Sequence, residues 1–305
     1  MHLSGFADEA ANDIIGQCRA TRELGWRWIE SRAIDGKNIH DIDDAAFERV
    51  VAHLAETGVG IDCFGSAIAN WAKHITDPAD ASLAEARRAI PRMRRLGAKQ
   101  VRIMSFAVIP GKPPAEQLVE ERFRRLRELV AMFADAGIEA VHENCMNYGG
   151  MAASCTLRLL EAVPGLKLVY DTGNPIFTED FDAPARPDGT RPKQSAWAFY
   201  RAVRPHIARV HIKDGSVDAV SGEVRYAFPG EGVGDVRRIV EDLLATGYDA
   251  AFSIEPHLAA VHHDPKLTSS DAIRYANYVE YGRRFERLVA DARASVARRA
   301  ASGAR

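Results

Sequence analysis

The 305-residue sequence has few cysteines, little net charge and no long uncharged apolar run. Its four cysteines show no CxxC spacing and are too sparse for a disulfide framework, which is typical of proteins from a reducing compartment. The N-terminus, MHLSGFADEA, lacks the basic and apolar regions of a signal peptide, and no segment approaches the ~18 apolar residues of a membrane-spanning helix. These absences predict a soluble, cytoplasmic protein without a membrane partner.

The balance of charge argues against a nucleic-acid partner. The chain has 40 basic and 42 acidic residues, which gives a net charge of −2. Proteins that follow a phosphate backbone generally carry a basic excess, because neutralising phosphates supplies much of their affinity. We therefore expect no DNA or RNA partner.

Short apolar runs alternate with longer segments of helical spacing along the whole chain. Several of the longer segments end in a glycine, such as Gly25, Gly97 and Gly137, and glycine adopts the left-handed conformation just past a helix without steric cost. An apolar run follows each of these glycines, so the order is helix, cap, strand. We expect eight strands, near residues 3–7, 27–31, 59–64, 100–105, 138–143, 166–171, 207–212 and 250–255.

Eight strands that alternate with helices predict βαβ units closed into a (β/α)8 TIM barrel. An open, doubly wound sheet is the alternative, but no GxGxxG loop follows the first strand and no GxxxxGK[ST] loop occurs. We expect one α/β domain over 1–305, with 288–305 as a C-terminal helical tail. Two irregular stretches, 174–193 and 214–234, follow strands, so they should lie over the C-terminal mouth of the barrel.

Four consecutive strands end in residues of metal-binding type. The endings are AVHEN with Glu143, LVYDTGN with Asp171, RVHIKD with His211 and SIEPH with Glu255. Neighbouring strands of a barrel are only ~4.8 Å apart, so these side chains can converge at one rim. Each residue alone could instead cap a helix or form a salt bridge, but polar residues at four successive strand ends favour a shared site.

The alternation of side chains along the strands agrees with such a site. If the four residues point into the barrel, their outward neighbours, His142 excepted, are apolar, as a surface under helices should be. Three carboxylates at one rim would repel one another without a cation. Together with one imidazole they form an oxygen-rich donor set for one divalent ion, with Mn²⁺ favoured and Mg²⁺, Co²⁺ or Zn²⁺ as alternatives.

At these residues the chain resembles the sugar phosphate isomerase/epimerase superfamily, the xylose isomerase-like TIM barrels. The resemblance covers nearly the whole chain and depends on an ordered set of motifs: GFADEA, IESRAIDGKNI, HEN, YDTGNP, HIKD, FPGEGVGD and IEPH. It implies a (β/α)8 barrel with one divalent ion at the C-terminal face. The ligands that it implies are Glu143, Asp171, His211 and Glu255.

The chain departs from two branches of this superfamily. Ketose 3-epimerases have a substrate-contacting histidine where this chain has Asn174 and an arginine where it has Val217, so recognition of a free ketose is not implied. The related DNA-repair endonucleases bind three zinc ions with further ligands, and Val224, Tyr226 and Asn174 stand in three of those places. A trinuclear site is therefore not expected.

The chemistry that fits this site is proton transfer at a carbon next to a carbonyl, through an enediolate. Glu143 and Glu255 would remove and return the proton. We therefore expect a metal-dependent isomerase or epimerase that acts on a sugar, keto-sugar or polyol derivative. The alternative is a lyase of the inosose or keto-glycoside dehydratase type, because the same intermediate can lose a β-hydroxyl. A repair-type phosphodiester hydrolase and a non-catalytic sugar-binding protein remain further alternatives.

Two basic residues beyond the expected ligands are candidates for substrate contacts. His257 lies two residues after Glu255 and shares its parity, so it should overhang the pocket, where it either forms a hydrogen bond with substrate or packs within the loop. Lys213 lies two residues after His211, where it either stabilises an enediolate or pairs with Asp214.

Two further candidates are less closely tied to the ligands by spacing. Asn174 either contacts substrate or forms an Asx turn before a proline. Glu30, at the end of the second strand, either contacts substrate from the far side of the rim or pairs with Arg32. The remaining histidines, His262 and His263 among them, have no comparable spacing. The sequence leaves homo-oligomer formation open.

Overall fold

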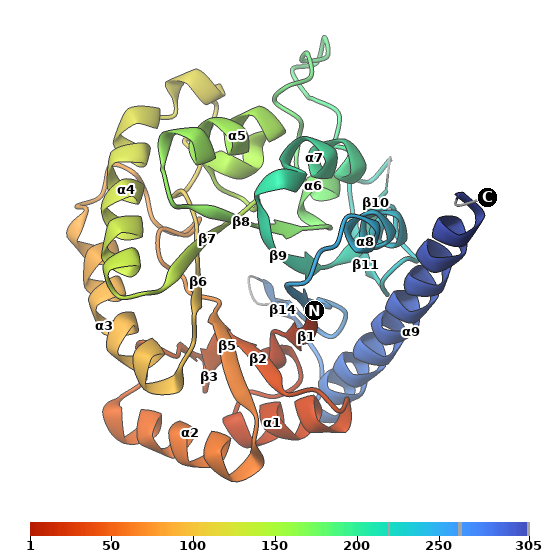
Figure 1. The fold of residues 1–305 in the computed structure, drawn as a ribbon. Helices are drawn as coiled ribbons and strands as arrows, with labels where there is room; N and C mark the ends of the chain where they lie inside the picture. The colour runs from red at the N-terminus through yellow and green to blue at the C-terminus, as the bar shows by residue number, and fades with distance from the viewer. Residues whose placement is uncertain (219, 262–263, 304–305) are drawn as a thin grey trace.

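Parallel strands form the centre of the computed structural model, which describes residues 1–218, 220–261 and 264–303 (Figure 1). The eight-stranded sheet has the order β1-β12-β9-β8-β7-β6-β5-β2, and its end strands β1 and β2 contact each other, so the barrel is nearly closed. The expected (β/α)8 fold is confirmed, and each expected strand overlaps an observed one. The barrel strands are β1 (His2–Gly5), β2 (Trp28–Ser31), β5 (Gly60–Phe64), β6 (Gln100–Ile103), β7 (Glu139–Glu143), β8 (Lys167–Asp171), β9 (Ile207–Ile212) and β12 (Ala251–Ile254).

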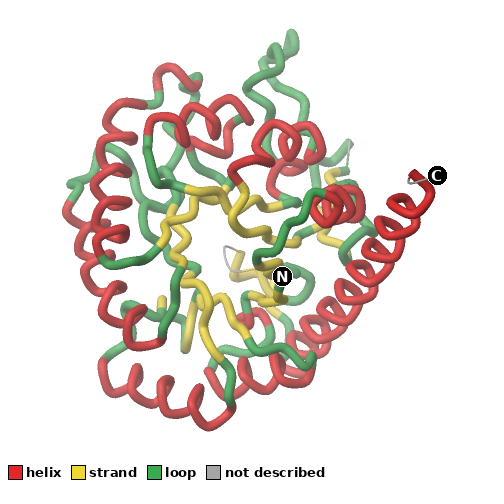
Figure 2. The backbone as a smooth tube through the Cα atoms, in the orientation of Figure 1, coloured by secondary structure: helices red, strands yellow, loops and turns green. Residues whose placement is uncertain are grey.

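Helices surround the strands as an outer layer (Figure 2). Of the α-helices, α6 is a single turn directly after β8, and α9 runs along the outside next to α1 and α8. The α-helices are α1 (Ile14–Glu23), α2 (Asp44–Thr57), α3 (Asp80–Leu96), α4 (Val119–Asp135), α5 (Ala153–Ala162), α6 (Asn174–Phe177), α7 (Ala196–Val203), α8 (Val236–Ala245) and α9 (Asp271–Gly303), and the short 3₁₀ helices are η1 (Ala7–Glu9), η2 (Pro114–Glu116), η3 (Tyr148–Met151) and η4 (Arg204–His206).

Local signals in the sequence set several helix ends. The Asp13 carboxylate accepts a hydrogen bond from the Gly16 amide at 2.8 Å and caps the start of α1. Helices α2 and α3 end at glycines with φ of 69° at Gly58 and 75° at Gly97, a conformation that costs a residue with a Cβ more than it costs glycine. These ends fix where the chain leaves the helix layer and enters the next strand.

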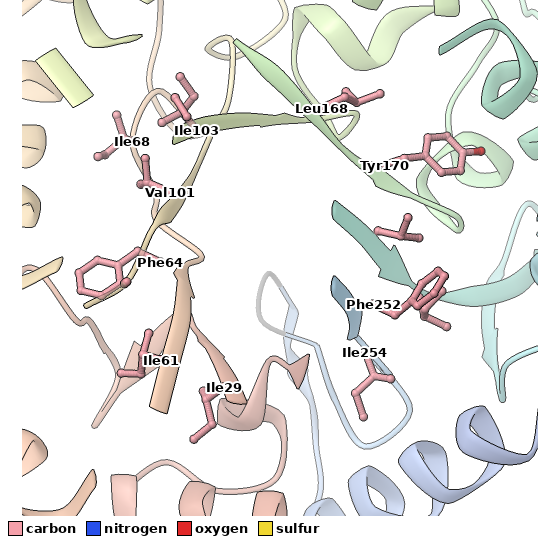
Figure 3. Packing of buried hydrophobic residues seen from close by; sticks show 14 of the residues in the cluster. Ile29, Ile61, Phe64, Ile68, Val101, Ile103, Leu168, Tyr170, Phe252 and Ile254 are labelled. Carbon is pink, nitrogen blue, oxygen red and sulfur yellow. The ribbon is translucent and has the colours of Figure 1, made fainter. Parts of the chain in front are cut away.

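The outward faces of the strands pack against the helices, as the alternation predicts. Figure 3 shows Leu168, Tyr170, Phe252 and Ile254 pointing away from the centre of the barrel. All four are fully buried, and the Tyr170 hydroxyl donates to the carbonyl of Ala196 at the start of α7 at 2.6 Å. With the apolar residues turned outward, the opposite faces of the strands are left to line the barrel interior.

That interior carries charged groups rather than only branched apolar residues. Arg209 on β9 is almost fully buried and forms hydrogen bonds with side chains of β2, β5 and β6. Those strands do not neighbour β9 in the sheet, so the guanidinium must cross the inside of the barrel. A charged interior of this kind differs from the layers of Val, Ile and Leu common in TIM barrels.

The C-terminal helix is longer than the expected tail over 288–305. Helix α9 begins at Asp271, because one of its faces buries Tyr278, Tyr281, Phe285 and Leu288. Where 214–234 was expected to be irregular, the chain forms an antiparallel hairpin of β10 (Asp214–Val217) and β11 (Val224–Ala227). The remaining short strands are β3 (Ala33–Ile34), β4 (Lys37–Asn38), β13 (Ala260–Val261) and β14 (Asp264–Thr268).

His262 and His263 lie outside the described residues. Within the described residues, no helix combines the length and the apolar character needed to cross a membrane.

Candidate metal centre

The four expected ligands meet at the C-terminal ends of adjacent strands. Glu143 and Asp171 are the last residues of β7 and β8, His211 is the penultimate residue of β9, and Glu255 directly follows β12. Each offers a ligand atom, and these atoms all lie within 4.8 Å of one another. All four side chains are buried. The structure therefore brings the four residues together around one point, as the strand order predicts.

The donor atoms of this cluster suit a cation. Nδ1 of His211 is buried and has no hydrogen-bond partner among the described residues, and it lies 3.6 Å from Oε1 of Glu143 and 3.8 Å from Oε2 of Glu255. Oδ2 of Asp171 is likewise buried and accepts no well-aligned hydrogen bond there, and its one close polar neighbour is Nζ of Lys213 at 3.0 Å. Buried polar atoms without hydrogen bonds are rare and call for a ligand or ion that would satisfy them. Three carboxylates and one imidazole fit a divalent ion.

Short backbone motifs hold Asp171 in place. Its Oδ1 accepts hydrogen bonds from the amides of Gly173 at 2.8 Å and Asn174 at 2.7 Å, so the TGN turn fixes one carboxylate oxygen. Oδ1 of Asn144 accepts from the amide of Asp171 at 2.7 Å, and Nδ2 of Asn144 donates to its carbonyl at 3.1 Å. The HEN motif therefore positions the YDTGN motif of the neighbouring strand.

Each ligand carboxylate also has a basic partner. Nη1 of Arg102 lies 2.9 Å from Oε2 of Glu143, and Nη1 of Arg32 lies 3.0 Å from Oε1 of Glu255. Nζ of Lys213 lies 3.0 Å from Oδ2 of Asp171 and 2.9 Å from Oε2 of Glu255. Arg102 and Arg32 were not among the expected site residues, although both lie in or just after barrel strands, where the same strand-end rule applies.

These neighbours shift the pKa values of the ligands in different directions. Burial would raise the pKa of Glu143, but Arg102 and His211 outweigh it and lower that pKa to about 2. Burial raises the pKa of Asp171 to about 6, against the opposing effect of Lys213. Burial would lower the pKa of His211, but the carboxylates of Glu30 and Glu143 raise it to about 10. Protons and basic side chains thus balance the charge of the cluster in the protein alone.

A cavity of about 230 Å³ opens above this cluster. His257, Lys213 and Asn174, which the sequence suggested as substrate contacts, line this cavity. Apolar and aromatic side chains from the loops after the strands, from α6 and from β11 form much of the remaining wall: Trp71, Met104, Met146, Phe177, Val224 and Tyr226.

His257 is held at this wall by Glu9, a residue that the sequence reasoning missed. The backbone amide of His257 donates to Oε2 of Glu9 at 2.7 Å, and Nδ1 lies 2.9 Å from Oε1 of the same carboxylate. The φ angle of His257 is 55°, a left-handed conformation that is uncommon for residues other than glycine. Glu9 belongs to the GFADEA motif. The resemblance included this motif, but none of its residues was expected to lie at the site.

Glu9, Glu255 and His257 also form a second group with ligand-type atoms within 4.8 Å of one another. The guanidinium of Arg32 already lies against this group, with Nη2 3.2 Å from Oε1 of Glu9 and Nη1 3.0 Å from Oε1 of Glu255. A fixed positive charge there opposes a second cation by direct repulsion.

Lys213 does not form the pair with Asp214 that was one of its alternatives, and Asn174 has a contact that the sequence did not suggest. Lys213 pairs with Asp171 and Glu255 and not with Asp214. The carboxylate of Asp214 instead accepts hydrogen bonds from the backbone amides of Gly230 and Gly234, in the loop 228–234. Nδ2 of Asn174 donates to Oε1 of Glu143 at 3.1 Å, so this residue orients a ligand as well as lining the cavity.

Glu30 does not lie where a substrate contact would be expected. It is fully buried beneath His211 and is not part of the cavity wall. The alternative pairing with Arg32 is not found either, because Glu30 pairs with Arg209 and His211 while Arg32 pairs with Asp8, Glu9 and Glu255. The position of Glu30 at the end of a barrel strand could be predicted from the sequence, but the depth of its side chain could not.

Comparison with known proteins gives the family of this fold. The family model of the xylose isomerase-like TIM barrel matches residues 18–277, while no curated protein gives a significant match. Among solved structures, a xylose isomerase-like TIM barrel protein from Mycobacterium smegmatis in complex with magnesium is 19% identical with a TM-score of 0.66, over 96% of this chain and 97% of that chain.

Two other solved structures have similar scores and carry names of enzymes. An L-ribulose 3-epimerase is 17% identical with a TM-score of 0.65, over 96% of each chain. The probable 3-DHS dehydratase AsbF from Bacillus anthracis is 16% identical with a TM-score of 0.62, over 91% of this chain and 97% of that chain. At these identities the likeness concerns the fold. The match of the family model over most of the sequence shows that the chain belongs to the xylose isomerase-like TIM barrel family.

Proposed function

We propose that this protein is a divalent-metal-dependent isomerase or epimerase that acts on a sugar, keto-sugar or polyol derivative. The observation that carries the proposal is the pair of carboxylates, Glu143 and Glu255, that border one cavity from β7 and from the end of β12. The epimerase among the structural neighbours is consistent with this chemistry.

The donor set supports one ion held by Glu143, Asp171, His211 and Glu255. When bound, a divalent cation would stabilise negative charge that develops on a substrate oxygen. We favour Mn²⁺ because the set is rich in carboxylate oxygens, with Mg²⁺, Co²⁺ and Zn²⁺ as alternatives. The magnesium in the Mycobacterium smegmatis protein agrees with an ion of this class.

The side chains of the site would divide the proton transfer between them. One of Glu143 and Glu255 removes a proton from the carbon next to a carbonyl, and the other returns a proton to the resulting enediolate. Return to the same carbon from the opposite face gives an epimer, and return to the neighbouring carbon gives an isomer. Arg102 and Asn174 orient the first carboxylate by hydrogen bonds at 2.9 and 3.1 Å.

A dehydratase is the second candidate, favoured by the position of Lys213. Its ammonium lies 2.9 Å from Oε2 of Glu255 and borders the cavity, where it could donate a proton to a departing hydroxyl. The same enediolate that would be reprotonated in an epimerase would then lose water. The probable dehydratase among the neighbours agrees with this alternative.

Solvent-deuterium exchange over a panel of ketoses, inososes and 3-keto-glycosides tests both candidates. We expect metal-dependent incorporation of deuterium into one substrate class, with an epimer or isomer as the product. A dehydrated product would instead show that the enzyme is a dehydratase. Glu255→Gln should abolish exchange, and Glu286→Gln, on α9 outside the site, should not. Stabilisation by sugars without any exchange or turnover would instead favour a sugar-binding protein.

Metal content separates this proposal from a repair-type hydrolase. We expect one ion per chain, because Arg32 lies where the second acidic group could hold another. Two or three zinc ions per chain with cleavage of DNA would favour the hydrolase. We also propose a carbohydrate as the small-molecule partner and a cytoplasmic location, the latter from four cysteines that are all free.

A further inference from the structure

A buried carboxylate lies directly beneath the metal ligand His211. Nε2 of His211 is 3.1 Å from both Oε1 and Oε2 of Glu30, and neither side chain is exposed. Glu30 comes from β2, on the other side of the barrel from β9, and the pairing of β2 with β5 shifts register between Ile29 and Glu30. The contact therefore crosses the barrel interior below the cavity.

The position of Glu30 is itself fixed by Arg209. Nη1 of Arg209 lies 3.1 Å from Oε2 of Glu30, and Nη2 lies 2.7 Å from Oδ2 of Asp62. The remaining donor of the guanidinium, Nε, donates to Oε1 of Gln100 at 3.0 Å. A planar guanidinium with all three nitrogens engaged is a rigid support, and its charge favours an ionised Glu30.

This arrangement determines which nitrogen of His211 can bind a cation. An ionised carboxylate only accepts hydrogen bonds, so Nε2 must carry the proton that lies between it and Glu30. In the neutral ring the lone pair then belongs to Nδ1. That atom has no hydrogen-bond partner among the described residues and faces the carboxylates of Glu143 and Glu255.

We propose that Glu30 is a positioning residue, which holds His211 with Nε2 protonated and Nδ1 directed at the metal and thereby sets the metal affinity. This role rests on the metal site proposed above and replaces the substrate contact expected for Glu30. Partners of this kind orient a metal-bound histidine and raise its basicity, and their loss typically weakens metal binding about 10- to 100-fold.

Metal affinity measured by competition with a chelator, with Zn²⁺ and Mn²⁺ as the probes, tests this role. We expect Glu30→Leu, which removes the acceptor, to weaken binding about 10- to 100-fold. Glu30→Gln should weaken binding less than Glu30→Leu does, because an amide oxygen in the place of Oε2 can still accept from both His211 and Arg209, although the NH₂ group in the place of Oε1 must turn away from Nε2. The matched control is Glu286→Leu, which removes a carboxylate that accepts from the ring N–H of Trp26 at 2.7 Å.

A second measurement does not depend on a folded Leu variant. Long-range ¹H–¹⁵N spectra of the unaltered, Zn²⁺-loaded protein report which ring nitrogen of His211 carries the proton. We expect a protonated Nε2 and a metal-bound Nδ1, and the opposite assignment would overturn the role of Glu30. Unchanged affinity in Glu30→Leu overturns this role alone, whereas absence of metal binding by the unaltered protein overturns the metal site and the role together.

Discussion

Nη1 of Arg102 lies 2.9 Å from Oε2 of Glu143, so one carboxylate of the candidate metal site forms a buried ion pair with the neighbouring strand β6. Both side chains are almost entirely buried. We expect Arg102→Met to destabilise the chelator-treated protein by about 3–5 kcal/mol, because it leaves a buried carboxylate without its partner. Added Mn²⁺ should restore part of the loss, because a bound ion supplies positive charge at the same carboxylate.

Thermal or denaturant unfolding with chelator and with Mn²⁺ measures both effects. The matched control is Arg124→Met, which removes an exposed pair with Glu121 whose Nε–Oε2 distance is 2.7 Å. An exposed pair contributes only about 0–1 kcal/mol, so this variant should unfold almost as the unaltered protein does. Equal effects of the two substitutions would show that the Arg102 pair does not stabilise the site.

Metal binding should release protons and strengthen as pH rises. The pKa of His211 is raised to about 10 and that of Asp171 to about 6, so the imidazole is charged at neutral pH in the protein alone and must lose its proton to bind a cation. Affinity should therefore increase with pH through the pKa of Asp171 and on toward that of His211. Titration calorimetry in buffers of different ionisation enthalpy counts the protons, and a count of zero at pH 7 contradicts the arrangement.

The hairpin beside the cavity should depend on the carboxylate of Asp214. Its Oδ1 accepts the amides of Gly215 at 2.8 Å and Gly234 at 2.9 Å, and its Oδ2 accepts those of Gly230 at 2.8 Å and Gly232 at 3.1 Å. In Asp214→Asn an NH₂ group must face two of these N–H donors. Each buried amide that loses its acceptor in this way destabilises the loop by about 1–3 kcal/mol.

Hydrogen exchange followed by mass spectrometry is the measurement for this loop. We expect faster exchange over residues 228–234 in Asp214→Asn and a higher KM, since Val224 and Tyr226 of the hairpin line the cavity. Asp218→Asn is the control, because Asp218 also accepts two backbone amides but lies exposed near the hairpin tip. Equal hydrogen-exchange rates over residues 228–234 in the two variants would contradict this role of Asp214.

Asn174 should affect catalysis more than folding. Its Nδ2 donates to Oε1 of Glu143 at 3.1 Å, whereas its backbone amide, which any residue retains, donates to Asp171. Asn174→Ala should lower kcat/KM by about 10- to 100-fold, in line with a hydrogen bond to a charged group of about 1.5–3 kcal/mol. Asn277→Ala, which removes an exposed amide that donates to a carbonyl of α9, should leave kcat/KM unchanged. A result in which both variants retain full kcat/KM would exclude this role of Asn174.

Much of the fold follows from local patterns. Glycines such as Gly97 marked the helix ends, and the apolar run after each marked the next strand, because these features depend on near neighbours in the chain. The four ligands could be predicted together because equivalent strand ends of a barrel must share one rim. The start of α9 was missed, since its buried face becomes evident only when the barrel surface it covers is known.

The side chains that contact the four candidate ligands could not be predicted from local patterns in the sequence. Arg102, Arg32 and Glu9 contact the ligands or His257 from β6, from the residue after β2 and from η1, all distant in sequence from their partners, and a strand-end rule does not say which of these side chains pair. Glu30 illustrates the difficulty, because alternation correctly turns it inward but says nothing of its depth beneath His211. Register between strands on opposite sides of the barrel decides that depth.

The position of a bound ion is the most direct test of the central proposal. Crystals grown with Mn²⁺ and measured for anomalous scattering should show one strong peak per chain, within coordination distance of Glu143, Asp171, Nδ1 of His211 and Glu255. No peak among these four residues, or two or three peaks around Glu9 and His257 as well, would contradict the single-ion site from which the proposed chemistry follows.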